Sequence, residues 1–360
     1  MPVKTVSVEH FLALARQYPV VDVRSPAEFS HAHFPGAYHL PLFTDEERAI
    51  VGTLYHHQGR EAAIRKGLDF FGPKMRALTE QAELIWQKHH TSGEEKVEKG
   101  SFLLYCWRGG MRSRAIAWLL DLMGYEVYLL QGGYKAFRQA VLHSFSIPLP
   151  LLLLGGYTGS GKTRILHRLR DQHIPVICLE ELAHHRGSAF GDLGMPLQPS
   201  QEMFENLLAM EIHRLLQLPD IQEKGIWTED ESQRIGDLVI PNALWEQMRK
   251  APVYFLEVPF EKRLQQIVAE YGQYDIGLIE AAILRISKRL GGVATRQALD
   301  YLHARKIPDC FAILLQYYDK LYQKSLHQRD SRVPVHHFPV HDAADEEIVC
   351  WLKQTRIPVS

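Results

Sequence analysis

Apolar residues gather along the chain in short runs, separated by stretches with helical spacing. In the first 140 residues these runs are PVVDVRS at 19–25, FLLYC at 102–106 and YEVYLLQGG at 125–133. Between the last two, RSRAIAWLLDLM at 112–123 has the three-to-four-residue periodicity of an amphipathic helix. Buried strands that alternate with helices are typical of a parallel α/β sheet. We therefore expect an α/β fold for this part of the chain.

The same rhythm begins again after the segment SFSIPLP at 144–150, whose two prolines interrupt regular structure. LLLLGG at 151–156 has the composition of a buried strand, and residues 260 to 330 have a mostly helical pattern. The predicted organisation is therefore a first α/β domain at 1–143, a linker at 144–150, a second α/β domain with a helical C-terminal part at 151–335, and a C-terminal segment at 336–360.

Composition and net charge limit the kinds of function that this chain can have. The 360 residues are 46% apolar, enough to fill a core in each domain. Forty-one Lys and Arg against 42 Asp and Glu give a net charge of -1, so a polyanion would have to bind at local basic patches. No apolar run approaches the roughly 18 residues of a membrane span, and the N-terminus lacks a signal sequence. We expect a cytoplasmic protein without a membrane partner.

The cysteines are far apart in the sequence and form no CxxC pair, which favours reduced thiols. Cys106 differs from the other three because it ends a predicted strand and precedes Gly109, Gly110 and a predicted helix. The unpaired N–H groups of a helix N-terminus favour a thiolate and bind an anion beside it, and Arg108 and Arg112 add positive charge. These residues predict a nucleophilic thiolate facing a tetrahedral anion. A small buried thiol without a chemical role is the alternative that they leave open.

The second domain contains GGYTGSGKT, in which Gly156 and four intervening residues precede Gly161, Lys162 and Thr163. A strand before this motif and a helix after it are the context of a P-loop. Backbone N–H groups of such a loop wrap a diphosphate, Lys162 neutralises its charge, and Thr163 can ligate Mg²⁺. The predicted phosphate-binding residues are Gly156, Thr158, Gly159, Ser160, Gly161, Lys162 and Thr163.

Three further stretches are candidate functional sites, and for each the alternative is a part of the surface without a functional role. Glu229, Asp230 and Glu231 follow a short apolar run, so Asp230 is a candidate Walker-B-like acid, or the three acids form a solvated turn. His185 and Arg186 lie in the glycine-containing HHRGSAFGD, which predicts either a substrate loop or a plain surface loop. A basic segment is either a solvated helix face or a contact for phosphate or tRNA; its cations are Arg285, Lys288, Arg289, Arg296, Arg305 and Lys306.

The stretch VVDVRSPAEFSHAHFPGAYHLPL at 20–42 resembles the opening of rhodanese domains, and with the Cys106 loop and LLQGGYKAF the resemblance covers nearly all of residues 1–140. It implies that the loop cysteine carries sulfur or selenium as a persulfide or selenide. Five residues separate Cys106 from Arg112, one more than in many rhodaneses and as many as in cysteine phosphatases, although Tyr105 stands where many tyrosine phosphatases have histidine. Phosphatase activity is therefore an alternative, and a phosphorylated chalcogen donor would fit both features.

The order of the two domains is similar to the tRNA 2-selenouridine synthase family. Seven motifs carry the match and span residues 20 to about 292. They are DVRSPAEF, DEERAIVGTLYHHQGREAAIRKGL, YCWRGGMRS, GGYTGSGKT, LAHHRGSAFG, EDESQRIG and RLGG. The resemblance implies that 2-thiouridine at the wobble position of tRNA becomes 2-selenouridine, after a geranyl group has been attached to the sulfur. The implied cosubstrates are selenophosphate and geranyl diphosphate, without a tightly bound cofactor, and an enzyme that supplies selenophosphate is a candidate partner besides tRNA.

The resemblance gives each domain a task. The P-loop would hold geranyl diphosphate, with Lys162 and any Mg²⁺ stabilising the departing diphosphate. Cys106 would take selenium from selenophosphate as a selenide, while Arg112 and the loop amides hold the phosphate. Two other functions stay open: a nucleotide-dependent phosphotransferase with a phosphatase-like cysteine domain, and a tRNA-binding module without catalysis.

Overall fold

A computed structural model describes residues 3–90, 99–340 and 344–354. The chain divides into two compact units, residues 1–143 and 144–360. Each unit has its own five-stranded sheet, and every strand pairing within these two sheets is parallel. The prediction of two α/β domains with parallel sheets is confirmed.

In the first unit, the sheet order places β4 at the centre, where all five of its residues are buried. From edge to edge the strands are β1 (Lys4–Val6), β5 (Glu126–Leu130), β4 (Ser101–Tyr105), β2 (Val20–Asp22) and β3 (Tyr38–His39). The helices are α1 (Val8–Leu14), α2 (Pro26–His31), α3 (Asp45–Gln58), α4 (Arg60–Phe71), α5 (Met75–His89), α6 (Met111–Leu122) and α7 (Gly133–Ser144), with a 3₁₀ turn at Gly72–Lys74. Apolar side chains of α5 and α6 pack with those of the central strands in one core cluster.

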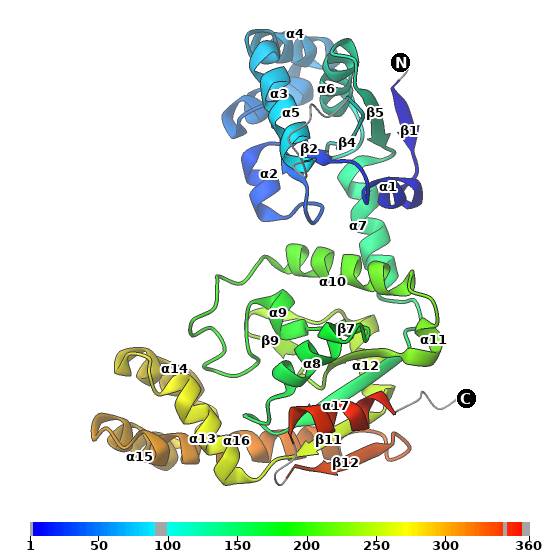
Figure 1. The fold of residues 1–360 in the computed structure, drawn as a ribbon. Coiled ribbons are helices and arrows are strands. Elements are labelled where there is room, and N and C mark those ends of the chain that lie inside the picture. Colours follow the sequence, from blue (N-terminus) through cyan, green and yellow to red (C-terminus); the bar gives the residue numbers. More distant parts are fainter. Residues whose placement is uncertain (1–2, 91–98, 341–343, 355–360) are drawn as a thin grey trace. The chain divides into compact units, whose positions relative to one another are not determined.

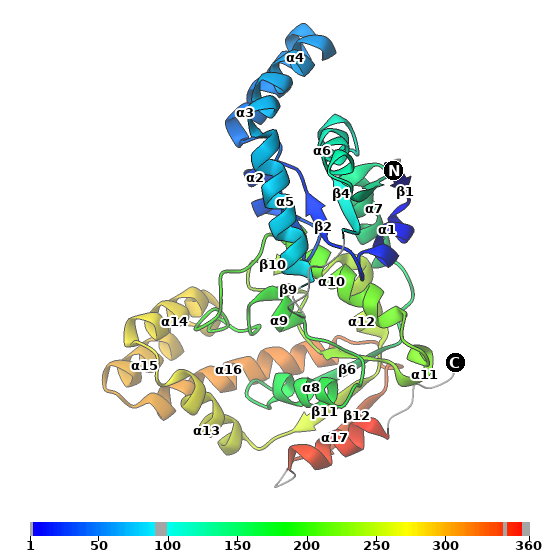
Figure 2. The ribbon, with the colours of Figure 1, turned by 45° about the horizontal axis from the view of Figure 1, so that its top comes forward.

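The pair α3 and α4 forms a helical hairpin that extends from the sheet (Figure 2). Gly59 joins the two helices with φ at +85°, a conformation that glycine adopts without strain. Along its 14 residues α3 has no fully buried side chain, and on α4 only Ala63, Gly67 and Phe71 are buried. Most of the hairpin's apolar surface is therefore not used for the core.

One charged pair lies inside the first unit. Asp22 at the end of β2 and Arg24 are 0% and 1% exposed. The Nε of Arg24 donates to Asp22 Oδ2 at 2.9 Å, and its Nη2 donates to Ala32 O at 2.7 Å. The guanidinium also lies 3.8 Å from the ring centre of Tyr134. This pair fixes the chain that leaves β2, where the resemblance to rhodanese domains begins.

In the second unit, β6 is the central strand and is buried along its whole length. From edge to edge the strands are β12 (Val335–Pro339), β11 (Val253–Glu257), β6 (Leu151–Gly156), β8 (Ile226–Glu229) and β7 (Val176–Ile177), beside a small antiparallel pair of β9 (Arg234–Ile235) and β10 (Leu238–Val239). The helices up to β11 are α8 (Lys162–Asp171), α9 (Leu179–Ala183), α10 (Gln201–Leu216), α11 (Ile221–Lys224) and α12 (Asn242–Lys250). Figure 1 shows the arrangement of these elements.

After β11 the chain is mostly helical to residue 327, as the sequence predicted. The helices are α13 (Phe260–Tyr271), α14 (Ile276–Leu290), α15 (Gly292–His303), α16 (Ile307–His327) and, after β12, α17 (Asp345–Lys353). The first four share one apolar core cluster. Among the described residues, no helix combines the length and the apolar composition needed to cross a membrane.

The C-terminal residues correct the predicted organisation. The segment 336–360 was expected to lie outside the second domain, but β12 pairs with β11 along five residues. Asp345 at the start of α17 forms ion pairs with Arg164 and Arg168 of α8, at 2.9 and 2.8 Å. The sheet is thus completed by residues that follow the long helical insertion, while residues 355–360 lie outside the described residues.

The predicted linker is packed against α12. The side-chain amide of Gln247 donates to Phe145 O at 2.9 Å, and its oxygen accepts from Leu149 N at 2.8 Å. Phe145 itself is buried. One glutamine thus satisfies backbone groups of residues 145–150, which lie outside helices and strands.

The buried pair in the first unit gives a stability prediction. Asp22→Ala leaves the Arg24 cation buried without its carboxylate, which costs about 3 to 5 kcal/mol. We expect urea denaturation to show a loss of that size in the unfolding free energy of the first unit. Glu61→Ala, which removes an ion pair with Arg65 that is about four-fifths exposed, is the matched control and should leave it unchanged. Equal losses in both variants would contradict the importance of the buried pair.

Candidate active sites

Cys106 follows the last residue of the central strand β4 and is 3% exposed. Its Sγ accepts a hydrogen bond from Gly110 N at 3.2 Å and lies 3.2 Å from Ser113 Oγ, at the start of α6. The N–H of Gly110 that donates to the sulfur stabilises a thiolate, whereas the Ser113 hydroxyl, which donates to Gly110 O at 3.2 Å, lies within hydrogen-bond distance of the sulfur. The sequence analysis missed Ser113, and its position directly after Arg112 was the available signal.

The glycines around this loop permit close approach of two backbones. A Cβ at Gly109, whose φ is +65°, would lie 2.7 Å from Leu130 O. A Cβ at Gly133, whose φ is +61°, would lie 2.3 Å from Cys106 O. With both side chains absent, Tyr134 N donates to Cys106 O at 2.8 Å. The QGG turn after β5 therefore supports the cysteine loop from behind.

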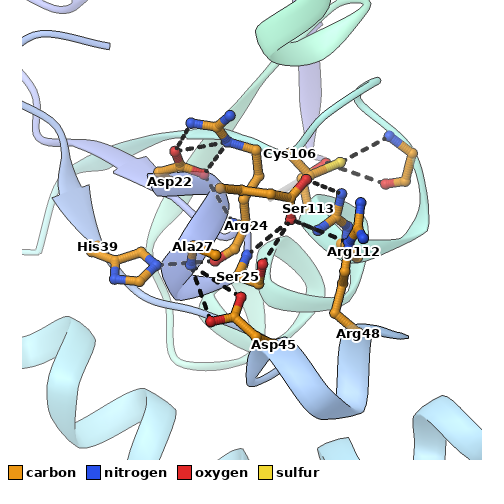
Figure 3. A network of polar contacts seen from close by, with 12 residues as sticks. Asp22, Arg24, Ser25, Ala27, His39, Asp45, Arg48, Cys106, Arg112 and Ser113 are labelled. Carbon is orange, nitrogen blue, oxygen red and sulfur yellow. Dashed lines mark hydrogen bonds and ion pairs between the residues drawn. The ribbon is translucent and has the colours of Figure 1, made fainter. Parts of the chain in front are cut away.

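Arg112 is held by an acid that the sequence did not single out. Its Nη1 and Nη2 donate to Glu28 at 2.6 and 3.3 Å, and Arg48 lies 3.8 Å from the same carboxylate (Figure 3). Burial acts to raise the pKa of Glu28, but Arg112, then the hydrogen bond from Ser25 N, and then Arg48 outweigh it, so the pKa is lowered. Glu28 thus fixes the direction of Arg112, whereas Arg108 is exposed on the loop.

A cavity of about 850 Å³ opens beside this loop, and Cys106, Arg108 and Arg112 are among its lining residues. The thiol, the loop cations and the cavity form the first candidate site. Cys106, Arg108 and Arg112, which the sequence predicted to act together, all line this cavity because they lie within seven residues of one another in the sequence.

In the second unit, the predicted P-loop leaves the central strand β6 and enters α8. Gly156, Gly159 and Gly161 all have positive φ, and Lys162 Nζ donates to Gly156 O at 2.9 Å. A Cβ at Gly159 would lie 2.9 Å from Ile267 and 3.0 Å from Arg263 O. The glycine spacing read from the sequence therefore corresponds to turns that other residues could not make.

Three carboxylates lie close to the start of α8. Thr163 Oγ1 donates to Glu180 Oε2 at 2.7 Å. Burial, and then the charge of Glu180, raise the pKa of Glu229 well above its ordinary value, and the same causes raise that of Glu231 against the opposing charge of Lys162. Glu229 Oε1 has no hydrogen-bond partner in the described part of the chain. Glu180, on the short helix α9, was not recognised from sequence.

The contacts of Asp230 differ from those expected of a Walker-B-like acid. Its carboxylate forms an ion pair with Arg329 and accepts a hydrogen bond from Tyr322 Oη at 2.5 Å. The same hydroxyl accepts from Gly156 N at 3.4 Å. Asp230 therefore braces the first glycine of the P-loop through Tyr322, while Glu180 is the acid that contacts Thr163.

A second brace of the P-loop comes from α13. Arg263 is 3% exposed, donates to Thr158 O at 3.1 Å, and forms a two-point ion pair with Asp319 at 2.8 Å. Its guanidinium lies 4.9 Å from the ring centre of Tyr157. Arg263 lies 105 residues from Thr158 in the sequence, so no local pattern could indicate this contact.

The predicted substrate loop lies against the same acids. A Cβ at Gly187 would lie 2.0 Å from Glu231 Oε1, which places the loop beside that carboxylate. His185 is buried, burial lowers its pKa, and its Nδ1 accepts from Gly187 N at 3.2 Å. Arg186 forms an ion pair with Glu270 at 2.8 Å. Arg186, one of the two residues predicted for this loop, is therefore already paired with an acid of the protein.

The basic segment lies on α14 and α15 and continues to residue 306. Arg285 is paired with Asp192 of the substrate loop, at 2.7 and 3.0 Å. Lys288, Arg289 and Arg296 have exposed side chains on these helices. The structure therefore separates Arg285, which holds a loop, from cations that face solvent.

Cys178, directly after β7, is buried, and its pKa is raised well above the ordinary value, mainly by burial. The fold also brings ligand atoms of His167, Cys178 and Glu181 within 4.8 Å of one another. Glu181, however, pairs with Arg170 at 2.7 Å. The spacing of these residues in the sequence did not indicate that they meet.

Known protein families match both domains of the chain. The family described as tRNA 2-selenouridine synthase AAA domain matches residues 149–357, and the rhodanese-like domain matches residues 7–140. A protein of Shewanella piezotolerans named tRNA 2-selenouridine synthase is 35% identical over 92% of this chain and 96% of its own. Proteins of the same name from Nitrosomonas europaea and Bdellovibrio bacteriovorus are 38% and 34% identical, over 83% and 91% of this chain and 75% and 94% of theirs. The chain belongs to the tRNA 2-selenouridine synthase family.

Proposed function

We propose that this protein is a transferase that replaces sulfur by selenium in 2-thiouridine at the wobble position of tRNA. The route passes through an S-geranyl intermediate and uses geranyl diphosphate and selenophosphate. The observation that carries this proposal is that each domain has a glycine-rich loop at the end of its central strand, one with the thiol of Cys106 and one with Lys162. One loop suits a diphosphate and the other a nucleophilic cysteine.

The P-loop serves the first step. The thiouridine sulfur attacks the first carbon of the geranyl group, the carbon–oxygen bond breaks, the diphosphate leaves, and the uridine loses its N3 proton. Loop N–H groups and Lys162 hold the diphosphate as its charge increases. The oxygens of Thr163, Glu180 and Glu229 fit Mg²⁺, which prefers oxygen ligands, and Glu229 Oε1, which has no hydrogen-bond partner among the described residues, supports this assignment. Bound there, the ion would neutralise part of the diphosphate charge.

Cys106 serves the second step. Selenium in selenophosphate is already at the oxidation level of selenide, so a bond from the thiol sulfur to selenium would require an oxidant. We therefore place the attack of the thiolate on phosphorus: the sulfur–phosphorus bond forms, the phosphorus–selenium bond breaks, and selenide leaves. Water then releases phosphate and the thiol. The loop length shared with cysteine phosphatases supports this route over the Cys106 selenide, and the N–H of Gly110 would stabilise the attacking thiolate.

The direct test is a reconstitution. The full chain is incubated with thiolated tRNA, geranyl diphosphate and selenophosphate, and the nucleosides are separated and identified by mass spectrometry. We expect S-geranyl-2-thiouridine without selenophosphate and 2-selenouridine with it. Nucleoside triphosphate turnover without any change in the tRNA would support the phosphotransferase instead.

Replacement of the thiol should separate the two steps. Cys106→Ser keeps the size of the side chain but has no thiolate near neutral pH, so we expect 2-selenouridine to disappear while geranylation continues. Cys350→Ser, at an exposed cysteine, is the matched control and should change neither step. A normal yield of 2-selenouridine from Cys106→Ser would remove the cysteine from the mechanism.

Replacement of the P-loop lysine should act on the other step. Lys162→Ala removes a charged contact to the departing diphosphate, worth about 2 to 4 kcal/mol in the transition state. We expect the geranylation rate to fall by roughly 30-fold to 1,000-fold, measured with saturating tRNA. Lys250→Ala, at the end of α12, is the control for loss of a surface cation. If Lys162→Ala transfers geranyl at the normal rate, the prenyl donor binds elsewhere.

The basic segment is proposed to contact tRNA. With a net charge of -1, the protein must gather its cations locally, so we expect Lys288, Arg289 and Arg296 to bind phosphates. Changing all three to glutamine should weaken tRNA binding and reduce the log-log salt slope by about 0.7 to 0.9 for each phosphate that is no longer neutralised. Arg285→Gln should have less effect, since Asp192 already holds Arg285. An unchanged slope with weaker geranyl diphosphate binding would identify the segment as a lid over the diphosphate.

A further inference from the structure

The α3–α4 hairpin carries one of the motifs that the proposed function leaves without a task. This motif is DEERAIVGTLYHHQGREAAIRKGL, residues 45–68. The hairpin contributes little to the core, yet Ile64 and Leu68 on α4 are 36% and 56% exposed. Both residues line the cavity beside Cys106. The hairpin thus forms one wall of the first candidate site.

The lining of this cavity has two distinct parts. On the side formed by the α3–α4 hairpin and the chain before it, most of the lining is apolar, with Leu42, Phe43, Val51, Ile64, Leu68 and Phe71 beside the polar Thr53, Tyr55, His56 and His57. Around Cys106 it is cationic, with Arg48, Arg108 and Arg112. A phosphate-sized donor would need only the cationic part. The apolar part therefore suits a second ligand that carries a hydrocarbon chain.

Small residues keep this space open. Gly52 on α3 lines the cavity, and a Cβ built there would meet no atom within 4 Å. At Gly67 a Cβ would lie 3.3 Å from Phe43 Cζ, so the absence of a side chain lets that ring approach α4. Ala49 and Ala63 line the same wall. Glycine inside an exposed helix lowers helix stability, so Gly52 leaves this room at a cost to the stability of α3.

We propose, on the basis of the function above, that this cavity binds the ten-carbon chain of S-geranyl-2-thiouridine while selenium replaces sulfur at Cys106. Selenide attacks C2 of the base, the C2–selenium bond forms, the C2–sulfur bond breaks, and its electron pair leaves with sulfur. The departing thiolate takes a proton and becomes geranyl thiol. Because the chain is attached to the leaving sulfur, it must lie within a few bonds of the atom that selenide attacks. Cys106 and the apolar wall line the same cavity, which meets that requirement.

The size of the cavity agrees with this occupant. Ten carbons, each allotted the roughly 30 Å³ of a water molecule in the liquid, need on the order of 300 Å³. The cavity of about 850 Å³ therefore accommodates the chain with space left for the base and for selenophosphate. Burial of each methylene changes binding by about fourfold, so the chain gives the modified nucleoside a large advantage over the unmodified one.

The test compares two leaving groups on the same tRNA. The wild-type full chain receives selenophosphate and tRNA with either S-geranyl- or S-methyl-2-thiouridine, and kcat/KM for 2-selenouridine is measured by mass spectrometry. Gly52→Phe fills the cavity while it raises the helix propensity of α3. Gly72→Phe is the matched control, because Gly72 lies outside the cavity lining and also has open space around its Cβ position. We expect Gly52→Phe to lower the S-geranyl to S-methyl ratio at least tenfold, and Gly72→Phe to leave this ratio within twofold.

The other outcomes overturn the proposal in recognisable ways. A wild-type enzyme that uses both substrates equally, or an unchanged ratio in Gly52→Phe, would show that the chain binds elsewhere although selenium transfer occurs. Conversion of neither substrate by the wild type would instead refute the proposed function, and the chain site with it. A far-ultraviolet circular dichroism spectrum that matches the wild type confirms that Gly52→Phe is folded when the ratio is measured.

Discussion

Both candidate sites depend on one constraint of parallel sheets. In each unit the central strand is buried along its length, and the chain that leaves it must turn into a helix whose first N–H groups have no partner within the helix. These groups point toward the loop at the carboxyl end of the strand, where anions and thiolates are stabilised. The sulfur of Cys106 accepts a hydrogen bond of this kind from Gly110 N. In the other unit, the side-chain amine of Lys162 donates a hydrogen bond to Gly156 O. The two candidate sites thus share the same backbone arrangement.

Each loop is held in place by buried charged pairs rather than by apolar packing alone. In the first unit Asp22 and Arg24 fix the chain after β2, and Glu28 then directs Arg112. In the second unit Arg263 with Asp319 holds Thr158 O, and Arg329 with Asp230 supports Tyr322. A buried pair that loses one partner leaves an uncompensated charge, so the geometry of these loops is strongly enforced. Such rigidity suits sites that must hold a diphosphate or a thiolate in one orientation.

The two sites differ in what surrounds the loop. The P-loop faces Glu180, Glu229 and Glu231, where burial and mutual repulsion raise the pKa values of the last two. Carboxylates crowded in this way suit a cation. Cys106 instead lies between arginines and an apolar wall supplied by α3 and α4. An electrostatic site for the departing diphosphate and a mixed site for a hydrocarbon chain with an anionic donor fit the two steps that we propose.

The sequence by itself determined the elements in which the signal is local. The parallel strands, the P-loop glycines and the loop from Cys106 to Arg112 could be predicted, because hydrophobic periodicity and residue spacing act within a few residues along the chain. Only the tertiary structure decided that Glu180 contacts Thr163, that Asp230 is taken by Arg329, and that β12 completes the second sheet. These contacts join residues that are far apart along the chain, and the selection among several nearby acids depends on burial and on which cation is within reach. The cavity under the α3–α4 hairpin was likewise invisible in the sequence, because an apolar residue on a helix has the same pattern whether it fills a core or lines a ligand site.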